Sequence, residues 1–271
     1  MLTMAEFFTL GLDIGSTASK CIVLKNGKDI VGSAIIPAGV GTSGPDRARR
    51  AAMESAGLDP ENALTTAATG YGRHTYPGAD YTLSELSCHA IGAHAFFPEA
   101  RTVIDIGGQD AKAIRLSEKG KMEGFLMNDK CAAGTGRFLD VMARALELDI
   151  TELADKDAEA VAPVSISSTC TVFAESEVIS QQAKGVNLAD LVAGIHNSVA
   201  ARAASLVKRL GLLEPVVMTG GVAQNAGVVR ALERELGVPV AVSPLAQLNG
   251  AYGAAIAAYE KYTKEQNHGS D

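Results

Sequence analysis

Two aspartates, each followed by an isoleucine and a glycine, head two copies of one short motif. Residues 12–24 read LDIGSTASKCIVL and residues 104–116 read IDIGGQDAKAIRL. A constant offset of 92 aligns Asp13 with Asp105 and Lys20 with Lys112, with six identities in 13 positions. An Asp-x-Gly turn suits a polyphosphate, because glycine lets backbone N–H groups approach phosphate oxygens closely and a carboxylate can hold Mg²⁺. The two copies therefore predict a site for a magnesium-bound nucleotide.

The residues around the turns supply further phosphate-binding groups. Ser16, Thr17 and Ser19 offer hydroxyl donors, and Lys20 offers a positive charge. A third glycine turn, Gly220-Gly221 within VMTGGVA, would let an adenosine approach the backbone. The candidate nucleotide-binding residues are Asp13, Gly15, Ser16, Thr17, Ala18, Ser19, Lys20, Asp105, Gly107, Gly108, Gln109, Gly220, Gly221 and Gln247.

Three side chains are candidates for hydrolysis of the nucleotide. Asp13 and Asp105 would hold Mg²⁺ through water, since magnesium sheds its hydration shell reluctantly. Gln109 could orient the attacking water, although a phosphate contact or a structural amide fits the sequence equally well. The five histidines form no spacing typical of metal ligands.

The cysteines raise a separate chemical possibility. Cys131 and Cys170 each precede a segment predicted to be helical, where the helix dipole favours a thiolate. Neither belongs to a Cys-x-x-Cys pair, which disfavours structural zinc. An iron–sulfur cube needs four thiolates, and two from each chain of a twofold dimer would supply them. Spacing alone leaves ordinary core or surface cysteines open as an alternative, and Cys21 and Cys88 are expected to be core thiols.

Strands mixed with helices must position these turns. Each Asp-x-Gly copy lies between two apolar runs and predicts a β-hairpin. A long helix is expected over 188–210, capped by Asn187 and Gly211, with its apolar residues on one face. Further helices are predicted over 46–57, 84–97, 132–148, 226–236 and 251–264, and strands over 65–69 and 215–218. Two related halves of this kind are typical of a two-lobed α/β protein with a central cleft.

Composition excludes several classes of protein. The chain has 271 residues, of which 47% are hydrophobic, and a net charge of −7. This acidic balance argues against nucleic acid as a partner, because phosphate neutralisation needs excess lysine and arginine. No stretch approaches the ~20 apolar residues of a membrane-spanning helix, and the N-terminus lacks the features of a signal peptide. We therefore expect a cytoplasmic protein with reduced thiols.

The three glycine turns resemble the phosphate-1, phosphate-2 and adenosine motifs of the acetate and sugar kinase/Hsp70/actin superfamily. The resemblance implies two ribonuclease-H-like α/β domains with ATP or ADP and Mg²⁺ in a cleft between them. The expected domains are 1–98 and 99–250, the second carrying Cys131 and Cys170, with a C-terminal helix over 251–265 packing on the first. The superfamily alone does not separate a kinase, a chaperone, a filament subunit and an energy-coupling ATPase.

The cysteine segments narrow that choice. The sequences around Cys131 and Cys170 resemble the activator component of 2-hydroxyacyl-CoA dehydratases, the BadF/BadG/BcrA/BcrD ATPase family. The resemblance runs from about Leu10 to Tyr259, and within the family it is strongest to activators of (R)-2-hydroxyglutaryl-CoA dehydratase. The other segments that carry it are 69–73, 84–89, 103–112, 217–225 and 243–251.

That resemblance implies a homodimer holding one [4Fe-4S] cluster, ligated by Cys131 and Cys170 of each subunit. Ferredoxin or flavodoxin would reduce the cluster. ATP hydrolysis would then drive one low-potential electron into the dehydratase, a separate protein that binds the acyl-CoA and there forms a ketyl radical. The alternative within the superfamily is a sugar or carboxylate kinase, which would need a carboxylate base for a substrate hydroxyl. A filament subunit, in turn, would form nucleotide-dependent polymers.

Overall fold

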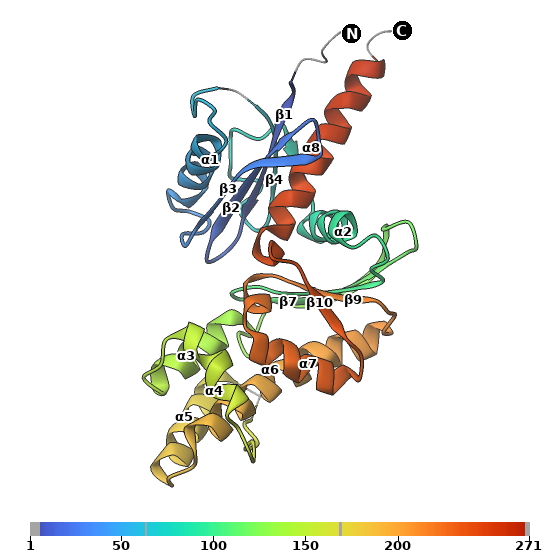
Figure 1. The fold of residues 1–271 in the computed structure, drawn as a ribbon. Coiled ribbons are helices and arrows are strands. Elements are labelled where there is room, and N and C mark those ends of the chain that lie inside the picture. The colour runs from blue at the N-terminus through green and yellow to red at the C-terminus, as the bar shows by residue number, and fades with distance from the viewer. Residues whose placement is uncertain (1–5, 63, 168–169, 269–271) are drawn as a thin grey trace. The chain divides into compact units, whose positions relative to one another are not determined.

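The computed structural model describes residues 6–62, 64–167 and 170–268. The chain divides into two compact units. Unit 1 is drawn from residues 1–98 and 247–271, and unit 2 from residues 99–246. In the described residues, each unit contains a five-stranded mixed sheet and several helices (Figure 1).

Unit 1 is built on three antiparallel strands extended by two parallel ones. The sheet order is β3-β2-β1-β4-β5, with β4 running parallel to β1. The strands are β1 (Phe8–Ile14), β2 (Ser19–Lys25), β3 (Asp29–Ile36), β4 (Thr65–Thr69) and β5 (Tyr81–Thr82). The helices are α1 (Gly44–Ser55), α2 (Glu85–Phe96) and α8 (Asn249–His268).

The alternation of side chains along β1 fixes where Asp13 points. Leu10, Leu12 and Ile14 are buried in one core cluster with residues of α1. On the opposite face, the Thr9 hydroxyl donates to the carbonyl of Ala255 in α8 at 3.0 Å. Because successive side chains of a strand point to opposite faces, Asp13 shares the α8 face with Thr9.

Unit 2 repeats the same sheet and covers it with more helices. Its sheet order is β10-β9-β6-β7-β8, again with an antiparallel trio, and β9 runs parallel to β6. The strands are β6 (Thr102–Ile106), β7 (Ala111–Leu116), β8 (Met122–Asn128), β9 (Val216–Thr219) and β10 (Val240–Val242). The helices are α3 (Gly136–Ala145), α4 (Leu153–Ala158), α5 (Thr171–Ala183), α6 (Leu188–Leu210) and α7 (Ala226–Leu236).

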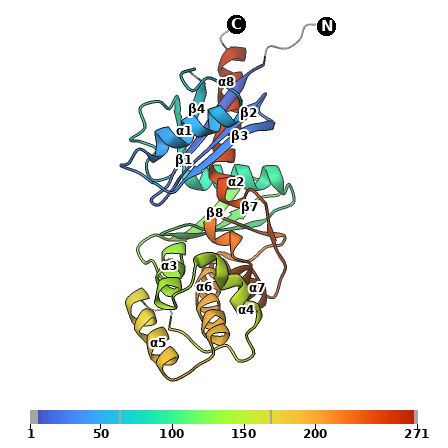
Figure 2. The same ribbon diagram turned by 60° about the vertical axis from the view of Figure 1, so that its left-hand side comes forward.

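Helix α6 is the main support of the second sheet. Its apolar face, including Ile195 and Val199, is fully buried with Ile104 and Ile106 of β6. Asn187 caps its first turn by accepting a hydrogen bond from the backbone of Ala189 at 2.8 Å. Figure 2 shows α6 and α7 packed side by side against this sheet. The bounds of α6 and both of its caps confirm the sequence prediction.

The structure confirms both predicted hairpins and changes the start of one helix. The hairpins are β1–β2 and β6–β7. The helix expected from about residue 132 begins instead at Gly136. Gly134 has a positive φ of 84°, and the hydroxyl of Thr135 donates to the carbonyl of Ala132 at 2.6 Å. Residues 132–135 therefore form a turn, and Cys131 does not directly precede the helix.

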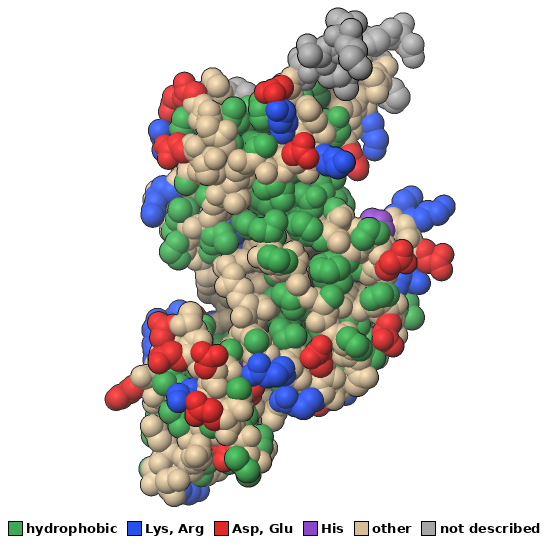
Figure 3. All heavy atoms as spheres, viewed as in Figure 1, with side chains coloured by type: hydrophobic (Ala, Val, Ile, Leu, Met, Phe, Trp, Pro, Cys, Tyr) green, Lys and Arg blue, Asp and Glu red, His purple; other side chains and the backbone are tan. Residues whose placement is uncertain are grey.

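The surface carries charges of both signs. On the face drawn in Figure 3, acidic and basic side chains of the described residues are interspersed, so neither sign dominates that face. Among the described residues, we find no helix that combines the length and the apolar character needed to cross a bilayer.

Candidate functional site

Asp13 lies at the end of β1 with its carboxylate buried. It is directly opposite Lys20 in the hairpin, and its Oδ2 lies 3.1 Å from Lys20 Nζ. The residue is 3% exposed, and Oδ1 has no hydrogen-bond partner among the described residues. A buried carboxylate oxygen without a donor costs free energy unless a ligand satisfies it. Asp13 Oδ1 therefore fits a bound cation or a water of its hydration shell, since hard cations take oxygen ligands.

The turn between β1 and β2 presents backbone and hydroxyl groups beside Asp13. Ser16 and Ala18 are partly exposed and Thr17 is exposed, so the turn is accessible to a ligand. The backbone N–H of Gly15 is already used, since it donates to the carbonyl of Ala18 at 3.0 Å. Ser19 differs from the others because it is buried in β2 and its hydroxyl donates to the carbonyl of Ala38 at 2.8 Å.

Asp105 occupies the equivalent place in unit 2 with more protein partners. It lies opposite Lys112 in the β6–β7 hairpin, and Lys112 Nζ is 3.2 Å from Asp105 Oδ2 and 2.8 Å from Asp110 Oδ2. Thr219 donates its hydroxyl to Asp105 Oδ1 at 2.9 Å. All four residues are buried. Hydrogen bonds of the protein therefore fix the orientation of the Asp105 carboxylate.

One glycine stands beside each aspartate for the same geometric reason. Gly70 follows β4 and Gly220 follows β9, with positive φ values of 82° and 88°. A Cβ on Gly70 would lie 2.5 Å from Asp13 Oδ1, and one on Gly220 would lie 2.9 Å from Asp105 Oδ1. Any side chain at either position would therefore collide with the carboxylate and close the space around it.

The remaining candidate residues lie on turns of the two units. Gly107 and Gly108 follow β6, and their carbonyls accept hydrogen bonds from the backbone of Gly136 and Arg137 at 2.9 and 2.8 Å. Gln109 is exposed on the same turn. Gly221 begins a 3₁₀ turn over Gly221–Gln224, and Gln247 lies partly buried in another over Ala246–Leu248. Gln109 is therefore accessible to a ligand of unit 2.

Sequence reasoning missed a histidine beside Asp13. His89 on α2 is 5% exposed, and its Nδ1 lies 3.3 Å from the side-chain amide nitrogen of Asn249. A Cβ on Gly250 would lie 3.0 Å from His89 Nε2 and 3.3 Å from Asp13 Oδ2. The two side chains thus border one small space in unit 1. No local sequence signal shows this, because β1, α2 and the start of α8 meet only in the folded chain.

The cysteines fall into two pairs with different surroundings. Cys21 and Cys88 are completely buried, and burial raises the pKa of the Cys88 thiol to about 12 and holds that of Cys21 well above its ordinary value. Both thiols are therefore protonated and unreactive at neutral pH. Cys131 and Cys170 are partly exposed and belong to unit 2. Only this second pair is accessible to an iron–sulfur cluster.

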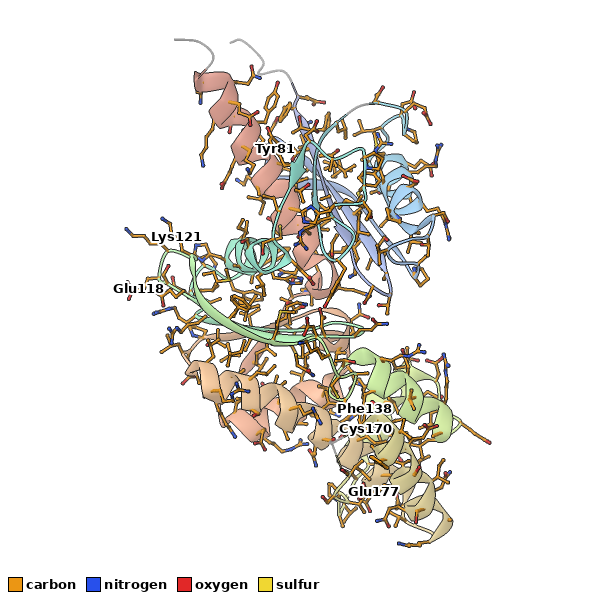
Figure 4. The ribbon with its side chains drawn as sticks, turned by 180° about the vertical axis from the view of Figure 1, so that it is seen from behind. Tyr81, Glu118, Lys121, Phe138, Cys170 and Glu177 are labelled. Carbon is orange, nitrogen blue, oxygen red and sulfur yellow. The ribbon has the colours of Figure 1, made fainter. Side chains whose placement is uncertain are left out.

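The backbone around each accessible cysteine is held in place. The Asn128 side-chain amide donates to the carbonyl of Cys131 at 3.0 Å. Cys170, which is labelled in Figure 4, is the N-cap residue of α5, and its carbonyl accepts from the backbone of Ala174 at 3.0 Å. The Glu177 carboxylate accepts from the backbone of Ser167 at 2.7 Å. Ser168 and Thr169, which directly precede Cys170, lie outside the described residues.

Helix α5 carries an exposed apolar surface next to Cys170. Val172, Phe173 and Ile179 are 65%, 69% and 50% exposed. Large apolar side chains this exposed on one helix are typical of a surface that another protein covers.

Comparisons with known proteins identify the family of the chain. A sequence model of the BadF/BadG/BcrA/BcrD ATPase family matches residues 10–258. The chain is 58% identical to the (R)-2-hydroxyglutaryl-CoA dehydratase activating ATPase of Acidaminococcus fermentans, over 96% of this chain and 100% of that protein. It is 56% identical to the activator of lactoyl-CoA dehydratase of Anaerotignum propionicum, over 95% of this chain and 100% of that protein.

A solved structure extends the similarity to the fold. The activator of the 2-hydroxyisocaproyl-CoA dehydratase from Clostridium difficile, with bound ADPNP, superposes with a TM-score of 0.93. It is 53% identical, and the match covers 97% of this chain and 98% of that chain. With the duplicated sheets, this confirms the expected fold class of two ribonuclease-H-like α/β domains.

Proposed function

This chain belongs to the BadF/BadG/BcrA/BcrD ATPase family, and on that basis we propose that it is the ATP-dependent activator of a 2-hydroxyacyl-CoA dehydratase. It couples hydrolysis of ATP to the transfer of one low-potential electron from a [4Fe-4S] cluster to the dehydratase. The observation that carries this proposal is the near full-length similarity, at 58% and 56% identity, to two dehydratase activators.

The nucleotide is bound by the duplicated turns. The backbone of residues 15–20 and 107–109 contacts the phosphates, and Gly220, Gly221 and Gln247 contact the adenosine. The buried Oδ1 of Asp13, which has no hydrogen-bond partner among the described residues, supports a magnesium site, and Asp105 would also hold the ion through water. Magnesium bound there would neutralise charge on the phosphates during hydrolysis. The exposed amide of Gln109 orients the attacking water.

The lysines opposite the two aspartates have different tasks. Lys20 is within 3.1 Å of Asp13 and its side chain is 18% exposed, so it can contact a phosphate while it stays paired with the carboxylate. Lys112 is 1% exposed and lies between Asp105 and Asp110. It compensates two buried carboxylates and holds that of Asp105 in position.

The cluster is ligated by Cys131 and Cys170 of two copies of the chain. Two accessible thiols per chain supply half of the four ligands that a [4Fe-4S] cluster needs, and a twofold dimer supplies the rest. When bound, the cluster would supply a one-electron carrier. The exposed apolar residues Val172, Phe173 and Ile179 on the helix that begins after Cys170 support this dimer. Ferredoxin or flavodoxin is the electron donor.

The dehydratase, a separate protein, determines which acyl-CoA is used. We assign (R)-2-hydroxyglutaryl-CoA as its substrate on the 58% identity to the activator named for that dehydratase. Because the activator named for lactoyl-CoA dehydratase is 56% identical, that enzyme is the matched comparison in any assay of specificity.

Activation of a purified dehydratase under strictly anaerobic conditions tests the proposal. The reduced protein with ATP and Mg²⁺ should activate (R)-2-hydroxyglutaryl-CoA dehydratase, whereas reduced protein with ADP, or oxidised protein with ATP, should not. Failure to activate either that dehydratase or lactoyl-CoA dehydratase would contradict the proposal. Stoichiometric phosphorylation of a sugar or carboxylic acid at the expense of ATP would identify a kinase instead.

A further inference from the structure

The loop that follows β4 packs directly against the end of β1, where Asp13 lies. The backbone N–H of Gly72 donates to the carbonyl of Ile14 at 2.9 Å, and a Cβ on Gly72 would lie 2.3 Å from Ile14 Cγ2. A Cβ on Gly70 would lie 2.5 Å from Asp13 Oδ1. Neither glycine therefore tolerates a side chain, and the loop lies against the Oδ1 side of the Asp13 carboxylate.

Arg73 is held in this loop by the carbonyl of Gly70. Its Nη1 donates to that oxygen at 2.9 Å, and its backbone N–H donates to the same oxygen at 3.3 Å. The residue is partly buried, and among the described residues no carboxylate forms an ion pair with its guanidinium. A guanidinium carries five N–H donors, of which this side-chain contact uses one. Arg73 therefore keeps both donors and an uncompensated positive charge for a ligand.

The guanidinium of Arg73 and Oδ1 of Asp13 are close enough to contact one ligand. Both lie next to Gly70, whose Cβ position and carbonyl oxygen are about 3 Å apart, so Nη1 is within about 9 Å of Oδ1. A magnesium ion with one phosphate fits a gap of this size, since each Mg–O bond is about 2 Å. Burial raises the pKa of the Cys88 thiol to about 12, the Asp13 carboxylate adds to the rise and the Arg73 guanidinium opposes it. Both charges therefore act on the same buried side chain of α2.

Two cations flank Asp13 from opposite sides of β1. Strand β1 pairs with β2 on one side and with β4 on the other. Lys20 on β2 lies 3.1 Å from Asp13 Oδ2, whereas Arg73 comes from the loop after β4, which packs against Oδ1. Oδ1 is buried and has no hydrogen-bond partner among the described residues. A magnesium ion bound at Oδ1 would therefore lie on the Arg73 side of the carboxylate.

We propose that Arg73 binds the terminal phosphate of magnesium-bound ATP. The terminal phosphate has more non-bridging oxygens and more negative charge than either inner phosphate, so oxygens remain for an arginine after magnesium has bound. A planar guanidinium can donate two parallel hydrogen bonds to them. During hydrolysis Arg73 keeps its proton and stabilises the charge that is spread over these oxygens. The inference rests on the proposed function, because it assigns a further residue to the proposed ATP site.

Nucleotides with and without a terminal phosphate separate this role from a structural one. In Arg73→Gln, the affinity for ADPNP with Mg²⁺, measured by isothermal titration calorimetry, should weaken about tenfold or more, because a charged hydrogen bond is lost. The affinity for ADP with Mg²⁺ should stay within about twofold of the wild type. The rate of phosphate release at saturating ATP should fall by about a hundredfold or more. Arg73→Lys, which keeps the charge and loses the planar pair of donors, should give intermediate values.

Arg49→Gln provides the matched control in unit 1. Arg49 is also partly buried, but its Nη1 and Nη2 donate to the carbonyls of Pro60 and Asn62 at 2.6 and 2.7 Å. Arg49→Gln should lower thermal stability and leave both nucleotide affinities at wild-type values. If Arg73→Gln does not fold, Arg73→Lys decides the question, because a lysine can still donate to the carbonyl of Gly70.

The outcomes separate this inference from the proposed function. Wild-type affinity for ADPNP in folded Arg73→Gln, or equal weakening of ADPNP and ADP, would overturn the role of Arg73 and leave the proposed ATP site intact. The same selective loss of ADPNP affinity in Arg49→Gln would also overturn it, because the effect would then be a general cost of removing an arginine from unit 1. A wild-type protein that binds neither nucleotide would contradict the proposed function itself.

Discussion

Asp13 and Lys20 lie directly opposite each other in the first hairpin, with 3.1 Å between carboxylate and ammonium. Asp105 and Lys112 repeat this pairing in the second hairpin at 3.2 Å. The copies differ in what else surrounds the carboxylate. Asp105 accepts from Thr219, whereas Asp13 keeps one buried oxygen without a partner among the described residues. The same hairpin element thus carries a carboxylate with an oxygen available to a ligand in unit 1, and a carboxylate oriented by protein hydrogen bonds in unit 2.

Replacing either aspartate should stop ATP hydrolysis without removing the cluster. We expect Asp13→Asn and Asp105→Asn to lower the rate of phosphate release by about a hundredfold or more, because each loses a charge that positions magnesium. Iron and sulfide content should stay at wild-type values, since the cysteines are separate residues. Wild-type turnover in both variants would mean that the two aspartates are only structural.

Lys112 should matter more for folding than any surface lysine. It is 1% exposed and lies within 3.2 Å of two buried carboxylates, so Lys112→Met removes a buried cation from both. We expect a loss of about 3–5 kcal/mol in the free energy of unfolding, measured with urea. Lys208→Met, which breaks an exposed pair with Glu235, is the control and should cost less than about 1 kcal/mol. Equal losses would contradict the assignment of Lys112.

The two pairs of cysteines should differ in their effect on the cluster. Cys131→Ala and Cys170→Ala each remove two thiolates per dimer, so both should lose iron, sulfide and the visible absorbance of the cluster. Cys21→Ala and Cys88→Ala should stay brown, because those thiols are buried and protonated. An intact cluster in Cys131→Ala would refute the ligand assignment.

The carboxyl group of Asp157 should make the stability of the fold depend on pH in the acid range. Burial raises the pKa of its carboxyl, but hydrogen bonds from His196 and Arg230 outweigh burial and hold the pKa below the ordinary value. A group with a depressed pKa stabilises the fold above its unfolded value and loses that contribution as pH falls through its folded value. Below about pH 4, the stability of the wild type should therefore fall more steeply than that of Asp157→Asn in urea titrations. Parallel curves would exclude this role.

Sequence signals within short segments predicted the elements that depend on local interactions, namely the hairpins and the capped ends of a helix. The offset of 92 residues identified both hairpins, and the caps at Asn187 and Gly211 gave the bounds of α6. Strands β3 and β8 were not predicted. The residues of both strands are almost all partly or fully exposed, and each strand pairs with its neighbour across a register shift, so neither shows a clean alternation of buried and exposed residues.

The site was harder to predict because its geometry is non-local. Ser19 looked like a phosphate donor, but strand alternation turns its hydroxyl to Ala38, on the face opposite Lys20. His89 looked isolated in sequence, and only the packing of α8 against both α2 and β1 brings it close to Asp13. The spacing of Cys131 and Cys170 did not by itself predict a cluster. Their interpretation as cluster ligands came from the resemblance to a family.

The most direct test follows the cluster and the dehydratase in one experiment. The reduced protein is mixed anaerobically with a stoichiometric amount of (R)-2-hydroxyglutaryl-CoA dehydratase, and the electron paramagnetic resonance signal of the reduced cluster is recorded with dehydratase activity. With ATP and Mg²⁺, the signal should disappear as activity appears, and neither change should occur with ADP or in Asp13→Asn. Equal loss of signal and equal activation with ADP would contradict the coupling of ATP hydrolysis to electron transfer.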